Sequence, residues 1–335
     1  MKSLLSLLLF CFVSAHAWAA QPDFDGMVEL RNRQKIHAVL YKAAAGKPTV
    51  VLINGLTYTT KAWDRMVTWL TDREVGVLTY DPRGMGKTLE ETGPAREVIP
   101  IETQAQDLEL LLAHFNLADV DLVGLSYGGA LAAVHASEYP ERVRNVVLMA
   151  PYVRPLKQQD QLIQQKVATY RLTHPADKRS EDEIYDDMLR DLIFQTYPIY
   201  EPVVKEHPWR LEAIFRMVQG IRKVNVLDAI KKLPRRSVHL MVAGKDQYVP
   251  RQDHDDLWAI LGKDQKVSRI NIEGSEHKIP EAVPTFAAGW VELIARGDSR
   301  LRDGREFTGS PSQGKAVSGT VVIDLPKDFL RFPGW

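Results

Sequence analysis

Three residue types that together perform nucleophilic catalysis follow apolar segments of this chain: a serine, an aspartate and a histidine. Ser126 lies in the stretch GLSYG (124–128), a G-x-S-x-G pattern between an apolar run and a helix-like run. Small residues two positions either side of the serine allow a tight strand-to-helix turn that holds its hydroxyl exposed on a strained backbone. A serine hydroxyl is a poor nucleophile alone, so the pattern requires a base and an orienting acid elsewhere.

Residues that could serve as acid and base follow two later apolar runs. Asp246 lies in VAGKDQYVP (242–250) and His277 in IEGSEHKIPE (272–281). In open α/β sheets, catalytic groups gather at the carboxyl ends of strands, and serine, acid, histidine is the chain order of one known triad arrangement. Other acids nearby belong to a helix-like run, where solvated carboxylates are the default: Asp253, Asp255 and Asp256. We therefore predict that Asp246 orients His277, which acts as base toward Ser126.

Acyl chemistry at a serine also needs donors for the oxyanion that forms on the substrate carbonyl. The backbone N–H of Tyr127, directly after the serine, is the first candidate. The second is the backbone N–H of Leu56, in the loop that follows TVVLING (49–55). Gly55 would let that loop approach the substrate closely. We predict an oxyanion hole made of these two amides.

The elements that must position these residues are visible as apolar runs without alternation. Solid apolar runs are typical of parallel strands that helices cover on both faces. Such runs alternate with amphipathic segments early in the chain and return later, at 49–55, 75–81, 120–126, 143–151, 237–244 and 267–274. The helix-like segment 101–116 carries Leu108, Leu111 and Leu112 at the spacing of a buried face. The predicted fold class is α/β, with a mostly parallel, doubly wound sheet.

The remaining segments divide the chain further. Residues 152–236 show helix-like runs and no convincing strand, including a capping box from Ser180 to Glu183. This segment is predicted to be a helical lid insertion that roofs the pocket beside Ser126 and separates the two parts of the core, 20–151 and 237–297. A hairpin signal at Asn32-Arg33 precedes the first parallel strand. Residues 298–335 are expected to form a C-terminal extension with a flexible start and one edge strand in TVVIDLP (320–326).

These motifs together resemble the α/β-hydrolase superfamily, in its lidded, single-domain serine hydrolase form. The resemblance covers roughly residues 28–296. YDPRGMGKT (80–88) is similar to the family's D-x-R-G-x-G loop, and GLSYGGALAA (124–133) is similar to its nucleophile turn. One departure is Asn54-Gly55, where many relatives carry His-Gly. The resemblance implies a carboxylesterase-like or lipase-like enzyme with Ser126, Asp246 and His277 as its triad.

Composition and the first residues bear on partners and location. Lysine plus arginine equals aspartate plus glutamate at 43 each, which argues against nucleic acid or an anionic membrane as partner. Residues 1–19 are predicted to be a cleaved signal peptide, because Lys2, the apolar run 4–13 and the small residues at 17 and 19 have the required order. That run is too short to span a bilayer. We therefore expect export to a periplasm or the medium.

The sequence thus predicts an exported serine hydrolase that cleaves an ester or similar acyl compound through an acyl-enzyme. No cofactor and no metal are expected, because the histidines lack metal-ligand spacing. Two alternatives stay open: an acyltransferase that uses the same triad, and a non-catalytic hydrolase-like binding protein. The expected partner is a small acyl substrate, and the sequence indicates none for the C-terminal extension.

Overall fold

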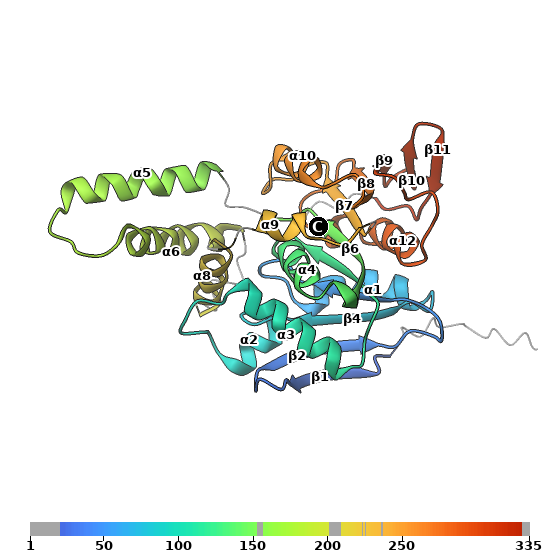
Figure 1. Cartoon of the computed structure of the whole chain (residues 1–335), viewed down its shortest axis with the longest axis horizontal. Helices are drawn as coiled ribbons and strands as arrows, with labels where there is room; N and C mark the ends of the chain where they lie inside the picture. Colours follow the sequence, from blue (N-terminus) through green and yellow to red (C-terminus); the bar gives the residue numbers. More distant parts are fainter. Residues whose placement is uncertain are drawn as a thin grey trace, which may run out of the picture.

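One mixed sheet runs through the part of the chain that the structure, a computed structural model, describes (Figure 1). The described residues are 21–152, 157–200, 209–222, 224, 226–235 and 237–329. The predicted signal peptide, with the only cysteine of the sequence, lies outside them. The strands of the sheet are β1 (Phe24–Glu29), β2 (Lys35–Tyr41), β3 (Thr49–Ile53), β4 (Gly76–Asp81), β5 (Val120–Leu125), β6 (Val143–Met149), β7 (Val238–Ala243), β8 (Lys266–Ile272), β9 (Arg305–Ser310), β10 (Lys315–Ser318) and β11 (Val321–Asp324).

The strand order is β1-β2-β4-β3-β5-β6-β7-β8-β9-β10-β11. All pairs from β4 to β9 are parallel, and the pairs at both edges of the sheet are antiparallel. The predicted hairpin joins β1 and β2, and Arg33 in its turn has a φ of 66°. The predicted α/β class with a mostly parallel sheet is confirmed.

The central strands are apolar for most of their length because helices cover both of their faces. In β3, Val50 and Leu52 face one apolar cluster, whereas Val51 and Ile53 face the other. The helices are η1 (Thr60–Trp63), α1 (Asp64–Thr71), α2 (Gly86–Thr92), α3 (Ile101–His114), α4 (Tyr127–Glu138), η2 (Pro140–Arg142), α5 (Lys157–Thr173), α6 (Glu181–Tyr200), α8 (Trp209–Arg222), α9 (Val226–Lys231), α10 (Arg251–Ile260), α11 (Ile279–Ala282) and α12 (Pro284–Ala295). α1 and α12 cover one face, and α3, α4 and α9 cover the other.

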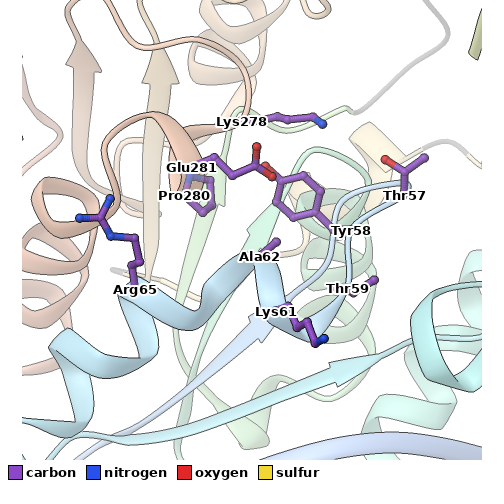
Figure 2. Close-up of a pocket in the computed structure, with 9 residues that line it drawn as sticks. All are labelled: Thr57, Tyr58, Thr59, Lys61, Ala62, Arg65, Lys278, Pro280 and Glu281. Atoms are coloured by element: carbon purple, nitrogen blue, oxygen red, sulfur yellow. The ribbon is translucent and has the colours of Figure 1, made fainter. Parts of the chain in front are cut away.

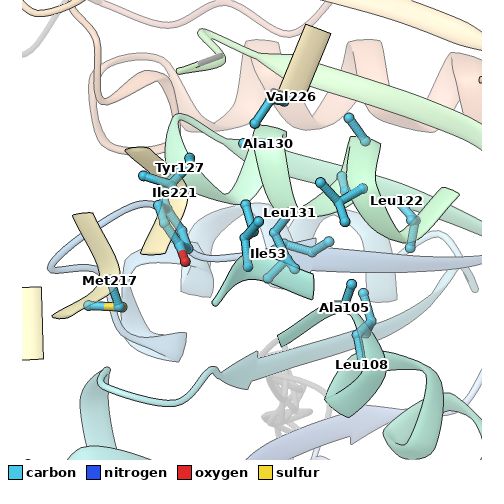
Figure 3. Packing of buried hydrophobic residues seen from close by; sticks show 14 of the residues in the cluster. Ile53, Ala105, Leu108, Leu122, Tyr127, Ala130, Leu131, Met217, Ile221 and Val226 are labelled. Carbon is cyan, nitrogen blue, oxygen red and sulfur yellow. The ribbon is translucent and has the colours of Figure 1, made fainter. Parts of the chain in front are cut away.

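The predicted lid insertion is helical over its described residues, but its helices do different things. α8 and α9 belong to the main core: Figure 3 shows Ile221 beside Tyr127 and Val226 beside Ala130. The N–H of Ile99 donates to the carbonyl of Arg216 at 3.2 Å, which ties α8 to the segment before α3. α5 and α6 pack on each other and extend away from the sheet (Figure 1).

The predicted capping box at the start of α6 is present. The N–H of Ser180 donates to Oε2 of Glu183 at 2.6 Å, and the N–H of Glu183 donates to Oγ of Ser180 at 3.2 Å. Two N–H groups at the helix start are thereby satisfied, as in other capping boxes.

The C-terminal extension contributes more to the sheet than the sequence indicated. Only one strand was expected there, at the edge, and β11 is that edge strand. Two further strands precede it, and β9 pairs in parallel with β8. The ring of Phe307 in β9 lies 5.1 Å from that of Trp290 in α12, in an edge-to-face arrangement. Residues 305–324 are thus continuous with the sheet that the predicted second part of the core, 237–297, helps to form.

Candidate active site

Ser126 occupies a strained turn between β5 and α4. Its backbone has φ 53° and ψ −114°, a region that non-glycine residues rarely adopt and that marks functional turns. A Cβ on Gly124 would lie 2.1 Å from the carbonyl oxygen of Gly128. A Cβ on Gly128 would lie 2.3 Å from the carbonyl oxygen of Ile53. The two glycines of the G-x-S-x-G pattern are therefore required by close backbone approach.

Asp246 and His277 meet at the carboxyl ends of β7 and β8. Nδ1 of His277 lies 2.8 Å from Oδ2 of Asp246. The other carboxylate oxygen, Oδ1, accepts the N–H groups of Tyr248 at 2.9 Å and Val249 at 2.8 Å. Because a carboxylate only accepts hydrogen bonds, this contact favours a proton on Nδ1 and leaves Nε2 of His277 able to accept one.

The burial of this pair preserves its geometry. The Asp246 side chain is only 3 % exposed and that of His277 only 9 %. The ring of Tyr248 meets that of His277 edge-to-face, with centroids 5.1 Å apart. The imidazole is therefore held by a carboxylate at one nitrogen and by an aromatic ring beside it.

Ser126 is on the same edge of the sheet as this pair. Its N–H donates to the carbonyl of Met149, the last residue of β6, at 2.9 Å. The next N–H, that of Ala150, donates to Met241 in β7 at 2.8 Å. Since β5, β6, β7 and β8 are parallel neighbours, the loops after them share one edge. All three predicted triad residues lie in such loops.

The two amides predicted to form an oxyanion hole are at the ends of neighbouring strands, β3 and β5. Among the described residues, the N–H groups of Leu56 and Tyr127 donate to no backbone oxygen. A Cβ on Gly55 would lie 3.2 Å from the carbonyl oxygen of Leu125, so the loop after β3 passes close to the end of β5. Backbone donors without a partner beside a strained serine are suited to bind an oxyanion.

A buried polar network holds the loop after β3, and sequence reasoning did not find it. Asn54, the departure from His-Gly, donates from Nδ2 to Oδ1 of Asp81 at 3.0 Å and accepts Nε1–H of Trp63 at 2.7 Å. Asp81 also accepts the N–H of Thr60 at 2.9 Å and that of Lys87 at 3.0 Å. The first aspartate of the D-x-R-G-x-G loop was the available signal, but the sequence does not show its partners.

His37 extends this network across β2. Its Nε2 lies 2.9 Å from Oδ1 of Asp25, and its Nδ1 lies 3.2 Å from Oδ2 of Asp81. Burial alone would lower the pKa of His37, but the two carboxylates outweigh burial and raise that pKa above its ordinary value. Lys87, whose Nζ lies 3.2 Å from Nε2 of His37, opposes this rise in pKa without cancelling it.

A cavity of about 480 Å³ opens beside these loops (Figure 2). It lies between the segment that follows Leu56 and the segment that follows His277. The residues that line it are Thr57, Tyr58, Thr59, Lys61, Ala62, Arg65, Lys278, Pro280 and Glu281.

The described residues also bear on metal binding and on membrane insertion. No group of three or more His, Cys, Asp or Glu side chains within the described ranges could hold a metal ion. No helix among those residues has both the length and the apolar character that a membrane span needs.

Residues 48–281 match the family described as alpha/beta hydrolase fold. The chain belongs to this family. The match includes the strained serine, Asp246 and His277, and it covers most of the sheet. Membership confirms the predicted superfamily and fold.

Similarity to individual proteins is partial. A 2-hydroxy-6-oxo-2,4-heptadienoate hydrolase of Pseudomonas putida is 36 % identical over 116 residues, which are 34 % of this chain and 41 % of that protein. A 3-oxoadipate enol-lactonase of Acinetobacter baylyi is 28 % identical over 104 residues, 31 % of this chain and 37 % of that protein. The matched regions thus span about two fifths of these relatives' own length.

Solved structures resemble the α/β-hydrolase chain over more of its length. An alpha/beta hydrolase enzyme from a Medee basin deep-sea metagenome library has a TM-score of 0.60 at 16 % identity, with 82 % of this chain and 98 % of that one covered. An esterase of Thermogutta terrifontis has a TM-score of 0.57 at 19 % identity, with the same coverages. At these identities the likeness establishes the fold alone.

Proposed function

We propose that this α/β-hydrolase is a serine hydrolase that cleaves an ester or similar acyl compound. The observation that carries the proposal is the 2.8 Å contact between His277 and Asp246, on the sheet edge that also bears Ser126 in its strained turn. A buried carboxylate bound to one imidazole nitrogen is the arrangement that makes the other nitrogen a base.

The proposed reaction has two halves. Nε2 of His277 takes the proton as Oγ of Ser126 attacks the substrate carbonyl, and the N–H groups of Leu56 and Tyr127 bind the oxyanion. The tetrahedral intermediate collapses, the bond to the leaving group breaks, and His277 returns the proton to that group. Water then attacks the acyl-enzyme with His277 as base, and the acid and free serine are released. Asp246 holds the imidazole tautomer and stabilises its charged form throughout.

The test combines a covalent probe with turnover. A labelled fluorophosphonate should modify the wild type and leave Ser126→Ala unmodified, and a panel of p-nitrophenyl esters should be hydrolysed only by the wild type. Ser137→Ala is the matched control, since the Ser137 hydroxyl donates within α4 to the carbonyl of Val134. Equal labelling of the wild type and Ser126→Ala would contradict the assignment, as would ester cleavage that survives in Ser126→Ala.

The nature of the acyl acceptor is a separate outcome of this test. With water as acceptor, the free acid accumulates in step with the released nitrophenol. If an added alcohol or amine captures most of the acyl group at millimolar concentration, the protein is an acyltransferase and the proposed hydrolase is wrong. If neither product forms and Ser126 stays unlabelled, a non-catalytic binding role replaces both.

We also propose that the protein is exported after removal of residues 1–19. The order of charge, apolar run and small residues in the sequence supports this. Intact-mass measurement on protein from the producing cell should show the mature chain beginning at Ala20. Full-length protein retained in the cytoplasm would contradict the proposal.

A further inference from the structure

The cavity of Figure 2 carries an excess of positive charge. Lys61, Arg65 and Lys278 line it together with a single carboxylate, Glu281. The whole chain has equal numbers of lysine plus arginine and of aspartate plus glutamate side chains, so the excess of positive charge is local to the cavity. A concave surface with an excess of one sign concentrates ligands of the opposite sign.

Two of these cations form no close ion pair within the described part of the chain, although Lys61 interacts electrostatically with Asp64. Lys61 in η1 and Arg65 in α1 are exposed and form no ion pair with a described residue. Lys278 lies with its Nζ 5.6 Å from the centre of the Tyr58 ring. The cationic side chains therefore come from two separate segments. In Figure 2 Lys278 lies on the other side of Tyr58 from Lys61 and Arg65, and the three charged ends point in different directions.

The cavity is joined covalently to the proposed reaction centre on both sides. Thr57 follows Leu56, whose N–H is one of the proposed oxyanion donors, and Lys278 follows His277. Successive Cα atoms are about 3.8 Å apart, so both segments that line the cavity begin one residue along the chain from a proposed catalytic group.

We propose that this cavity binds an anionic oxygen group of the substrate, a carboxylate or a phosphate, and that the enzyme therefore prefers acidic esters. The proposal rests on the proposed serine hydrolase function and specifies its substrate class. Because Lys61 and Arg65 are exposed, each is expected to favour the anionic substrate by about two- to five-fold, as is usual for solvated ion pairs.

The first experiment compares esters of matched length. The probes are p-nitrophenyl valerate, the p-nitrophenyl monoester of glutaric acid, p-nitrophenyl 4-phosphonobutyrate and p-nitrophenyl 5-(trimethylammonio)pentanoate, each corrected for its rate of hydrolysis without enzyme. At low ionic strength, kcat/KM should be higher for at least one of the two anionic esters than for valerate, and salt should reduce this preference. The anionic ester with the higher kcat/KM shows whether the cavity prefers a carboxylate or a phosphate-like group. A preference for valerate or for the cationic ester would overturn the proposal.

The second experiment uses variants that should act in opposite directions. Lys61→Gln and Arg65→Gln should each lower the ratio of anionic to neutral kcat/KM by about two- to five-fold. Glu281→Gln removes the only carboxylate of the lining and should raise that ratio. Lys315→Gln, on β10, is the charge-matched control and should leave the ratio unchanged. If these residues had only a structural role, removing a positive charge and removing the negative charge would not change the kcat/KM ratio in opposite directions.

The outcomes separate this proposal from the proposed function. If Ser126 is labelled and valerate is cleaved, but the variants leave the ratio unchanged, the cavity proposal is wrong and the hydrolase stands. If no ester is cleaved, calorimetry with glutarate and glycerol phosphate on Ser126→Ala tests the cavity directly. Binding that is lost in Ser126→Ala/Lys61→Gln/Arg65→Gln would support the anion site, and no binding would overturn it.

Discussion

Asp246 uses both of its carboxylate oxygens, one for His277 and one for two backbone N–H groups. In Asp246→Asn the amide can keep the backbone contacts, but its NH2 group would face Nδ1 of His277 and favour the wrong tautomer. For the proposed triad, we expect kcat for a p-nitrophenyl ester to fall by about 10³–10⁴-fold, as it does in known triads. Asp256→Asn, in the neighbouring α10, should retain activity within about two-fold, in line with a surface position. Comparable losses in the two variants would contradict the role of Asp246.

At the scale of residues, contacts between neighbours in the chain could be predicted from the sequence, whereas contacts between distant positions could not. Ser126 and its glycines are adjacent in the chain, so their turn could be predicted from the spacing. Asp246 and His277 each follow an apolar run, which indicated their common edge. Asn54 and Asp81 are 27 positions apart, and only the folded sheet brings them together. The residue types alone do not indicate that Asn54 pairs with Asp81 rather than with another buried polar residue.

At the scale of elements, the turn between β5 and α4 depends on the absence of a side chain at Gly128. A Cβ there would lie 2.3 Å from the carbonyl oxygen of Ile53, where no flexible side chain can move aside. Gly128→Ala should therefore destabilise the protein by about 2–4 kcal/mol in urea unfolding and abolish ester cleavage.

Gly26→Ala is the control for that variant. Its added methyl would meet only the Phe24 ring, at 3.5 Å, which is an ordinary contact distance. Stability and activity should both be retained. A stable, active Gly128→Ala protein would mean that the close approach of β3 and the turn is not required.

A second prediction at the scale of elements concerns the strand β9. Phe307 is 3 % exposed and packs edge-to-face on Trp290. Phe307→Ala should lower the free energy of unfolding by about 3–5 kcal/mol. Val322→Ala in β11, where the side chain is 47 % exposed, should change it by less than about 0.5 kcal/mol. Urea unfolding of both variants checks the prediction, and a small effect of Phe307→Ala would show that β9 is dispensable to the core.

β9 and β10 were not predicted because their sequence pattern differs from that of the central strands. In β9 only Phe307 and Gly309 are buried, and the polar Thr308 separates them. Such alternation with a glycine in it is a weak strand signal. The fully buried β4, β5 and β7 give mostly apolar runs that only isolated polar residues, such as Asp121 and His239, interrupt. The direction in which α5 and α6 extend could not be predicted either, because an apolar helix face does not specify its partner. The role of the lid insertion as a roof over the pocket beside Ser126 stays a prediction.

At the scale of the whole molecule, buried histidines make stability depend on pH. Burial lowers the pKa of His135 and of His239 to about 3 and that of His254 to about 4. In the unfolded chain these groups bind protons below about pH 6.5. The unfolded state then holds more protons than the folded state, so each histidine removes about 1.4 kcal/mol of stability per pH unit below that point.

His37 acts in the opposite sense, because its pKa is raised in the folded protein. Its contribution is complete below about pH 6.5 and is lost as pH rises through the folded pKa. Urea unfolding should therefore show stability falling by a few kcal/mol from pH 7 to pH 5. In His239→Gln the acid slope should be shallower by about 1.4 kcal/mol per pH unit. An unchanged slope would mean that His239 is protonated in the folded protein.

The pairing of β8 with β9 also has a consequence for how the chain is made. Residues 305–324 are the last described strands to leave the ribosome, so β8 has an unpaired edge while the nascent chain is still growing. Exposed strand edges with apolar neighbours are sites of aggregation. Trp290 in α12 is synthesised before Phe307, so the Phe307 ring cannot pack on it until β9 has emerged. The time between the emergence of α12 and the arrival of β9 is thus the interval in which a nascent chain most needs a chaperone.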